Sequence, residues 1–216
     1  MTFPVRAITL DLDDTLWPFA PIGVRVERTL DAFLREHSPQ TADMFPVEAM
    51  RRLRERVFAE NAHLIHDLSA LRQLTIEHAL RESGGDLALL DAAYEVFYAE
   101  RNRVEYYPDS LAALERIAAR VPVAAVTNGN ADLERVGIAH LFAFSLGSRE
   151  HGAAKPHASI FRAACDRLGC AHGDVLHVGD HIEADVAGAA RAGLRSCWIN
   201  REDRRWEHPE LAPDLE

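Results

Sequence analysis

The chain has 216 residues, of which 48% are hydrophobic and 27% are charged, and this composition is ordinary for a globular protein with a sizeable core. The formal net charge of −10 disfavours a nucleic-acid backbone or an anionic membrane as the main partner. With no run of 18 apolar residues and no signal-peptide pattern, we expect a soluble, cytoplasmic protein. The three cysteines lack CxxC spacing, so we expect neither a disulfide framework nor a zinc knuckle.

The first informative stretch is V-R-A-I-T-L-D-L-D-D-T-L-W, at residues 5–17. Its apolar run is short enough for a buried strand, and three carboxylates follow at Asp11, Asp13 and Asp14. On an extended backbone Asp11 and Asp13 point the same way, which a divalent cation or a shared proton would make tolerable. The alternative interpretation is a solvated turn after an edge strand.

The region after Trp17 changes to helical periodicity. We predict helices over about residues 24–34, 46–60, 67–82 and 86–103, with a break at Ser38-Pro39 and a boundary at Pro108. Residues 17–107 therefore form an inserted helical domain, between a core of residues 1–16 and 108–200 and a tail of residues 201–216. An insertion directly after the acidic cluster can close over a site as a lid.

Beyond Pro108 helices and strands alternate. The expected strands cover residues 123–126, 142–146, 175–178 and 195–199, and the expected helices cover residues 109–120, 131–136, 157–168 and 182–192. This alternation predicts an α/β fold with a doubly wound, Rossmann-like parallel sheet.

Polar residues follow two further predicted strands, Thr127-Asn128 after one and Asp180 after another. Lys155 stands at a helix start, and Asp185 follows Asp180 by five residues. Taken singly, Thr127-Asn128 indicates a turn, Lys155 indicates a solvated helix start, and Asp180 indicates a helix cap. Together with the acid pair they supply a nucleophile, an anion-binding hydroxyl and amide, a fixed cation and further acids, which phosphoryl transfer requires.

Four segments carry a resemblance to a known family. D-L-D-D-T-L at 11–16, T-N-G at 127–129, K-P at 155–156 and G-D-H-I-E-A-D at 179–185 resemble, in this order, the four motifs of the haloacid dehalogenase (HAD) superfamily. The resemblance spans roughly residues 5–200, and the helical insertion stands where that family carries its C1 cap.

The resemblance implies a role for each matched residue. Asp11 would be the nucleophile that forms an aspartyl-phosphate, and Asp13 would protonate the leaving alcohol and then activate water. Thr127, Asn128 and Lys155 would bind the phosphoryl group. The implied cofactor is Mg²⁺, held by Asp11, Asp13 through its backbone carbonyl, and Asp180, while Asp185 would hold Lys155 or a metal-bound water.

Asp13 also bears on the type of reaction. Dehalogenases of this superfamily lack that acid, so Asp13 favours a phosphatase that acts on a small phosphorylated metabolite. Residues 127–130, 177–181 and 61–72 are similar to bacterial phosphatases of FMN and of the phosphorylated ribityl-aminouracil intermediate of riboflavin synthesis. Trp17 and His66 are our candidates for substrate contacts, and a core tryptophan that anchors the hinge of the cap is the alternative for Trp17.

Three other functions remain open at this point. A phosphomutase of the same family would retain the phosphoryl group. A signalling receiver module also clusters Asp, Thr and Lys around Mg²⁺, but receivers are about half this length and carry no helical insertion. A non-catalytic binder of a phosphorylated ligand is the third.

Overall fold

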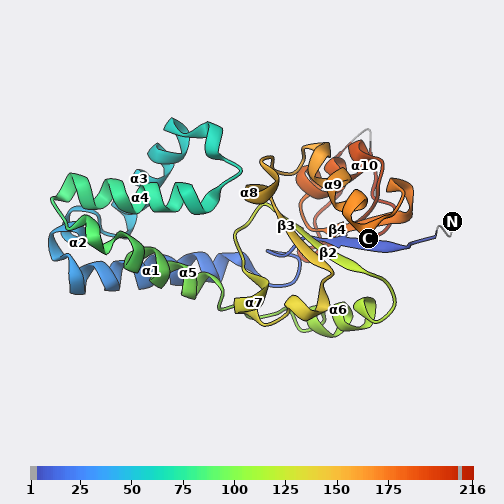
Figure 1. Cartoon of the computed structure of the whole chain (residues 1–216), viewed down its shortest axis with the longest axis horizontal. Helices are drawn as coiled ribbons and strands as arrows, with labels where there is room; N and C mark the ends of the chain where they lie inside the picture. Colours follow the sequence, from blue (N-terminus) through green and yellow to red (C-terminus); the bar gives the residue numbers. More distant parts are fainter. Residues whose placement is uncertain (1–3, 209–210) are drawn as a thin grey trace. The chain divides into compact units, whose positions relative to one another are not determined.

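The computed structural model describes residues 4–208 and 211–216, so residues 1–3 of the predicted core and 209–210 of the predicted tail lie outside it. The chain divides into two compact units (Figure 1). One ends at Pro18 and resumes at Glu105, and the other is Phe19–Val104. The description of the second unit as a cap stays a prediction.

The first unit is built on a five-stranded parallel sheet of order β3-β2-β1-β4-β5. The strands are β1 (Ala7–Leu10), β2 (Val123–Thr127), β3 (Phe144–Gly147), β4 (Val175–Gly179) and β5 (Arg195–Trp198). The central strand β1 is buried throughout and pairs with β2 and β4. Because Leu10 pairs with both Ala125 and Val178, all three strands end at the same edge of the sheet.

Helices lie on both faces of this sheet, with α9 and α10 on one face and α6 and α7 on the other (Figure 1). The predicted doubly wound α/β fold is therefore confirmed. Ile160 and Phe161 of α9 and Val126 of β2 belong to a buried apolar cluster. The helices and helical turns are α6 (Ser110–Ala118), α7 (Leu133–Val136), η3 (Ala139–Leu141), α8 (Ser148–His151), α9 (Ala158–Leu168), η4 (His172–Asp174), η5 (Ile182–Ala187) and α10 (Gly188–Ala192).

The second unit is entirely helical in its described secondary structure. Its first helix buries Ile22, Val26, Leu30 and Leu34, a spacing of four that places them on one face. This face contributes Leu30 and Leu34 to a separate apolar cluster. The elements are α1 (Phe19–His37), α2 (Pro39–Met44), α3 (Val47–Glu60), η1 (Ala62–Leu64), α4 (Leu68–Ser83), η2 (Leu87–Leu89) and α5 (Leu90–Arg101).

Three details differ from the sequence-based expectations. Ser38-Pro39 was expected only as a break, but Pro39 begins α2, because proline fits the first turn of a helix, where its missing N–H is not needed. The helix expected over 86–103 begins with the separate turn η2. The helix expected over 182–192 consists of the π-helical turn η5 followed by α10.

The tail shows no clear pattern in the sequence, but in the structure its residues 214 and 215 pack along the edge strand β5. Trp198 N donates to the carbonyl of Leu215 at 2.9 Å, and Leu215 N donates to the carbonyl of Ser196 at 3.1 Å. The Trp206 ring meets the Trp198 ring edge-on, with 5.1 Å between centroids. In the part of the chain that the structure describes, no helix is long and apolar enough to cross a membrane.

Glu27 forms the centre of an ion-pair network inside the helical unit. Its carboxylate is 9% exposed and accepts from Arg51 Nη2 at 2.5 Å and Arg54 Nη1 at 3.1 Å. Burial alone would raise the pKa of Glu27, but the hydrogen bonds and charges of the two arginines hold it below its usual value. The ionised carboxylate therefore stabilises the folded state.

We expect Glu27→Gln to lower the free energy of unfolding at pH 7 by about 1 kcal/mol, measured by urea denaturation. The stabilisation is fully present above the unfolded-state pKa of Glu27 and is lost as the pH falls through its lower folded-state pKa. The difference between wild type and variant should therefore shrink in acid. Glu48→Gln is the matched control, because Glu48 pairs with the same Arg51 but is 70% exposed. An equal effect of both substitutions would contradict this assignment.

Candidate active site

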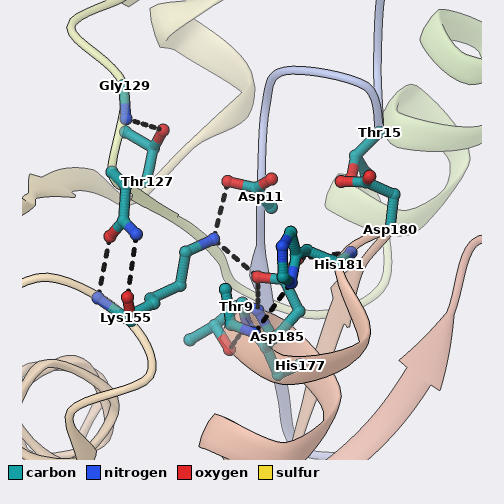
Figure 2. A network of polar contacts seen from close by, with 12 residues as sticks. Thr9, Asp11, Thr15, Thr127, Gly129, Lys155, His177, Asp180, His181 and Asp185 are labelled. Carbon is teal, nitrogen blue, oxygen red and sulfur yellow. Dashed lines mark hydrogen bonds and ion pairs between the residues drawn. The ribbon is translucent and has the colours of Figure 1, made fainter. Parts of the chain in front are cut away.

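The candidate site lies at the edge of the sheet where β1, β2 and β4 end. Asp11 follows β1, and its backbone N–H continues the ladder by donating to the carbonyl of Val178 at 2.9 Å. Thr127 is the last residue of β2, and Asp180 comes directly after β4. Figure 2 shows the side chains of Asp11, Thr127 and Asp180 at this edge, together with Lys155 and Asp185.

A buried ammonium group lies between two carboxylates at the centre of the site. Lys155 Nζ is 2.7 Å from Asp11 Oδ1 and 2.6 Å from Asp185 Oδ1. The Lys155 side chain is 2% exposed and that of Asp185 is 1% exposed. Burial alone would lower the pKa of Lys155, but the two carboxylates raise it, so the side chain stays charged.

Asn128 fixes the backbone of Lys155. Its side-chain nitrogen donates to the Lys155 carbonyl at 2.9 Å, and its side-chain oxygen accepts from the Lys155 N–H at 2.8 Å. In the structure this amide therefore positions the lysine, and direct contact of Asn128 with substrate stays a prediction. Thr127 Oγ1 accepts from the N–H of Gly129 at 2.9 Å, which closes the turn after β2.

Asp185 lies in the π-helical turn η5, in which the Val186 N–H bonds to the carbonyl of His181 five residues back. Such turns often occur at functional positions. Asp185 Oδ2 accepts from the His181 N–H at 2.9 Å. The backbone of Gly179 leaves room for this carboxylate, because a Cβ at that position would lie 2.3 Å from Asp185 Cγ.

A buried hydrogen-bonded chain extends from Asp185 into the sheet. His177 Nε2 lies 2.9 Å from Asp185 Oδ1, and His177 Nδ1 lies 2.9 Å from Thr9 Oγ1. Neither His177 nor Thr9 was predicted as a site residue. The available signal was one polar residue within each of two otherwise apolar strands, A-I-T-L and V-L-H-V-G.

The charges of this cluster shift the pKa values of its carboxyl groups. Burial raises the pKa of Asp11 to about 8, although the positive charge of Lys155 acts to lower it. Burial also raises the pKa of Asp180 to about 6, with added repulsion from Asp185 and Asp14. Burial would raise the pKa of Asp185 too, but Lys155 and His177 hold it far below its usual value.

The excess of negative charge fits a divalent cation. Asp11, Asp180 and Asp185 each offer an oxygen within 4.8 Å of the others, and the charge of Lys155 offsets only one of three carboxylates. Clustered carboxylate oxygens are the ligands that Mg²⁺ prefers. Among the residues that the structure describes, Asp13 adds no side-chain ligand to this group.

The remaining predicted site residues are Asp13, Trp17 and His66. Asp13 Oδ1 accepts from the indole N–H of Trp17 at 2.8 Å. Trp17 is fully buried, and contact of its side chain with substrate stays a prediction. His66 belongs to the helical unit, between η1 and α4.

The protein-family model described as a haloacid dehalogenase-like hydrolase matches residues 5–193. The chain therefore belongs to the haloacid dehalogenase-like hydrolases and is an enzyme, which confirms the resemblance seen in the sequence.

Several relatives with named activities are similar over nearly the whole chain. The 5-amino-6-(5-phospho-D-ribitylamino)uracil phosphatase YigB of Escherichia coli (strain K12) is 34% identical over 98% of this chain and 92% of its own. The phosphoserine phosphatase of Thermus thermophilus is 32% identical over 98% and 94%. A crystal structure titled 2-haloacid dehalogenase, from Pseudomonas syringae pv. Tomato DC3000, superposes with a TM-score of 0.89 at 37% identity, covering 96% of this chain and 91% of that one.

We expect Gly179→Ala to destabilise the protein by about 1–3 kcal/mol, because the added methyl group would overlap the Asp185 carboxylate. Gly173→Ala is the matched control, since a Cβ there meets nothing within 4 Å. Urea unfolding of both variants measures the difference. Equal free energies of unfolding for the two variants would show that the Asp185 side chain moves aside without an energetic cost. That result would contradict its fixed position between Lys155 and His177.

Proposed function

We propose that the chain is a Mg²⁺-dependent phosphatase that hydrolyses a small phosphate monoester through an aspartyl-phosphate on Asp11. The observation that carries the proposal is the buried contact of Lys155 with Asp11 and Asp185 at the edge of the sheet. The named phosphatases among its relatives, at 34% and 32% identity over nearly the whole chain, support the same chemistry.

In the proposed reaction a carboxylate oxygen of Asp11 attacks phosphorus and the ester P–O bond breaks. The leaving alcohol takes a proton from Asp13, and the Asp13 carboxylate then accepts a proton from the water that attacks the aspartyl-phosphate. Inorganic phosphate leaves, and the Asp11 carboxylate is restored. Lys155 offsets the charge of Asp11 and of the phosphoryl oxygens, with Thr127 as a further phosphoryl ligand.

Asp11, Asp180 and Asp185 would hold Mg²⁺, with the backbone carbonyl of Asp13 as a further predicted ligand. The ion would neutralise negative charge on the phosphoryl oxygens. The clustered oxygens of the three side chains support this assignment. Lys155 offsets one of their charges, and its contact with Asp185 orients the ammonium group toward Asp11.

A second candidate activity follows from the solved structure titled 2-haloacid dehalogenase, which is 37% identical to this chain. Dehalogenation would use Asp11 as the nucleophile on carbon, but the halide leaving group needs no proton. Asp13 would then have no task in the departure of the leaving group. We therefore favour the phosphatase and treat halide release from a 2-haloacid as the competing outcome.

For the substrate we propose FMN or the phosphorylated ribityl-aminouracil intermediate of riboflavin synthesis. The similarity to the phosphatase YigB, named for the latter compound, supports this class. Other relatives are named for phosphoserine and glyceraldehyde 3-phosphate, so the shared core does not by itself select the substrate. We propose the helical unit as the cap that makes the selection, with His66 as a contact.

The experiment is phosphate release from a panel containing FMN, phosphoserine, glyceraldehyde 3-phosphate and an aryl phosphate, alongside halide release from 2-chloropropionate. We expect phosphate release that disappears with EDTA and returns with Mg²⁺. Undiminished activity after chelation and desalting would contradict the metal requirement. Halide release without phosphate release would establish the dehalogenase instead, and an isomeric phosphate ester as product would indicate a phosphomutase.

We expect Asp11→Asn to lower phosphate release by more than about 10³-fold while the fold is retained, because an amide cannot attack phosphorus. Asp14→Asn is the matched control. Asp14 is exposed and its φ is 58°, a conformation that Asn tolerates. Near wild-type turnover by a clean Asp11→Asn preparation would exclude Asp11 as the nucleophile.

A further inference from the structure

The segment that follows Asp11 forms a tight turn, which brings residue 17 back beside residue 13. Asp13 and Trp17 form an isolated parallel bridge, and the Asp14 N–H donates to the carbonyl of Trp17 at 2.7 Å. Asp14 adopts a left-handed conformation, with φ of 58°. The turn therefore places the side chains of residues 13 and 17 next to each other.

The Trp17 ring is held firmly in this turn. It is fully buried and meets the Tyr106 ring edge-on, with 5.7 Å between centroids and 76° between planes. The preceding carbonyl, that of Leu16, accepts from the Tyr107 N–H at 3.0 Å and from Ser110 Oγ at 2.7 Å. An indole so fixed presents its N–H in one direction, to Asp13 Oδ1 at 2.8 Å.

An indole N–H is only a donor, and this determines which carboxyl oxygen can carry a proton. Asp13 Oδ1 can accept from Trp17 as a carboxylate oxygen or as the carbonyl oxygen of a neutral carboxyl group. If Oδ1 carried the proton, two hydrogens would meet across 2.8 Å. The proton of a neutral Asp13 therefore resides on Oδ2.

We propose that Trp17 is a positioning residue that orients Asp13 so that Oδ2 delivers its proton to the leaving alcohol. This inference depends on the proposed phosphatase function and assigns Trp17 a task other than substrate contact or packing alone. Loss of the indole N–H would remove a hydrogen bond that restricts rotation of the carboxyl group about its Cβ–Cγ bond. Proton transfer to the leaving group would slow because general acid catalysis requires a fixed geometry.

The leaving group of the substrate distinguishes this task from a structural one. An alkyl phosphate releases an alkoxide that needs a proton, whereas p-nitrophenyl phosphate releases a stabilised phenolate that needs little help. We expect Trp17→Phe to lower kcat/KM for an alkyl phosphate by about 10–100-fold and for p-nitrophenyl phosphate by less than about 3-fold. The ratio kcat/KM is the relevant quantity because it covers the steps through release of the alcohol.

Three further variants keep the result interpretable. Replacement of Trp17 by β-(3-benzothienyl)alanine retains the ring shape and removes only the N–H, and we expect the same selective loss even if Trp17→Phe folds poorly. Tyr106→Phe is the matched control, because the buried Tyr106 hydroxyl has no hydrogen-bond partner among the residues that the structure describes. This variant should hydrolyse both substrates as wild type does. In an Asp13→Ala background Trp17→Phe should cause no additional selective loss.

Parallel losses for both phosphate esters in the Trp17 variants, in proportion to the folded fraction, would overturn the inference and leave the proposed function standing. An additional selective loss in the Asp13→Ala background would also overturn it, since Trp17 would then act through another group. Wild-type protein that hydrolyses neither ester would overturn the proposed function and the inference with it.

Discussion

The contact on which the site depends is that of one buried ammonium group with two buried carboxylates. Lys155 lies 2.7 Å from Asp11 and 2.6 Å from Asp185, and the low exposure of these side chains limits the extent to which water can replace either partner. Removal of the lysine would leave two like charges close together in a poorly solvated environment, which is strongly unfavourable. The backbone contacts of Asn128 and the hydrogen bond of His177 maintain this arrangement from either side.

The sequence predicted the composition of this cluster well because its members follow a simple rule of parallel sheets. Apolar strands that end in polar residues bring those residues to one edge, so Asp11, Thr127 and Asp180 were found from the strand pattern alone. Asp185 and Lys155 were found from the spacing of the motifs. The π-helical turn that carries Asp185 and the loop that carries Lys155 have no comparable signal in the sequence. Their chemical roles stay predictions.

The site residues that were not predicted from the sequence depend on contacts between distant parts of the chain. His177 and Thr9 are 168 positions apart and meet only because β1 and β4 are neighbours. The buried setting of Trp17 likewise depends on Tyr106, which lies far along the chain. Pro39 was read as a break because proline can either begin or end a helix, and the local sequence did not distinguish the two. The tail showed no local periodicity because its order comes from β5.

The pairing of the tail with β5 has a consequence for how copies of the protein meet one another. An uncovered edge strand presents unpaired peptide groups onto which a strand of another molecule can add. Residues 214 and 215 occupy peptide groups of Ser196 and Trp198, and Asp214 also accepts from the Ser196 N–H and pairs with Arg195. Residues 214 and 215 thus cover peptide groups of β5 that would otherwise be open to pairing with a strand of another molecule.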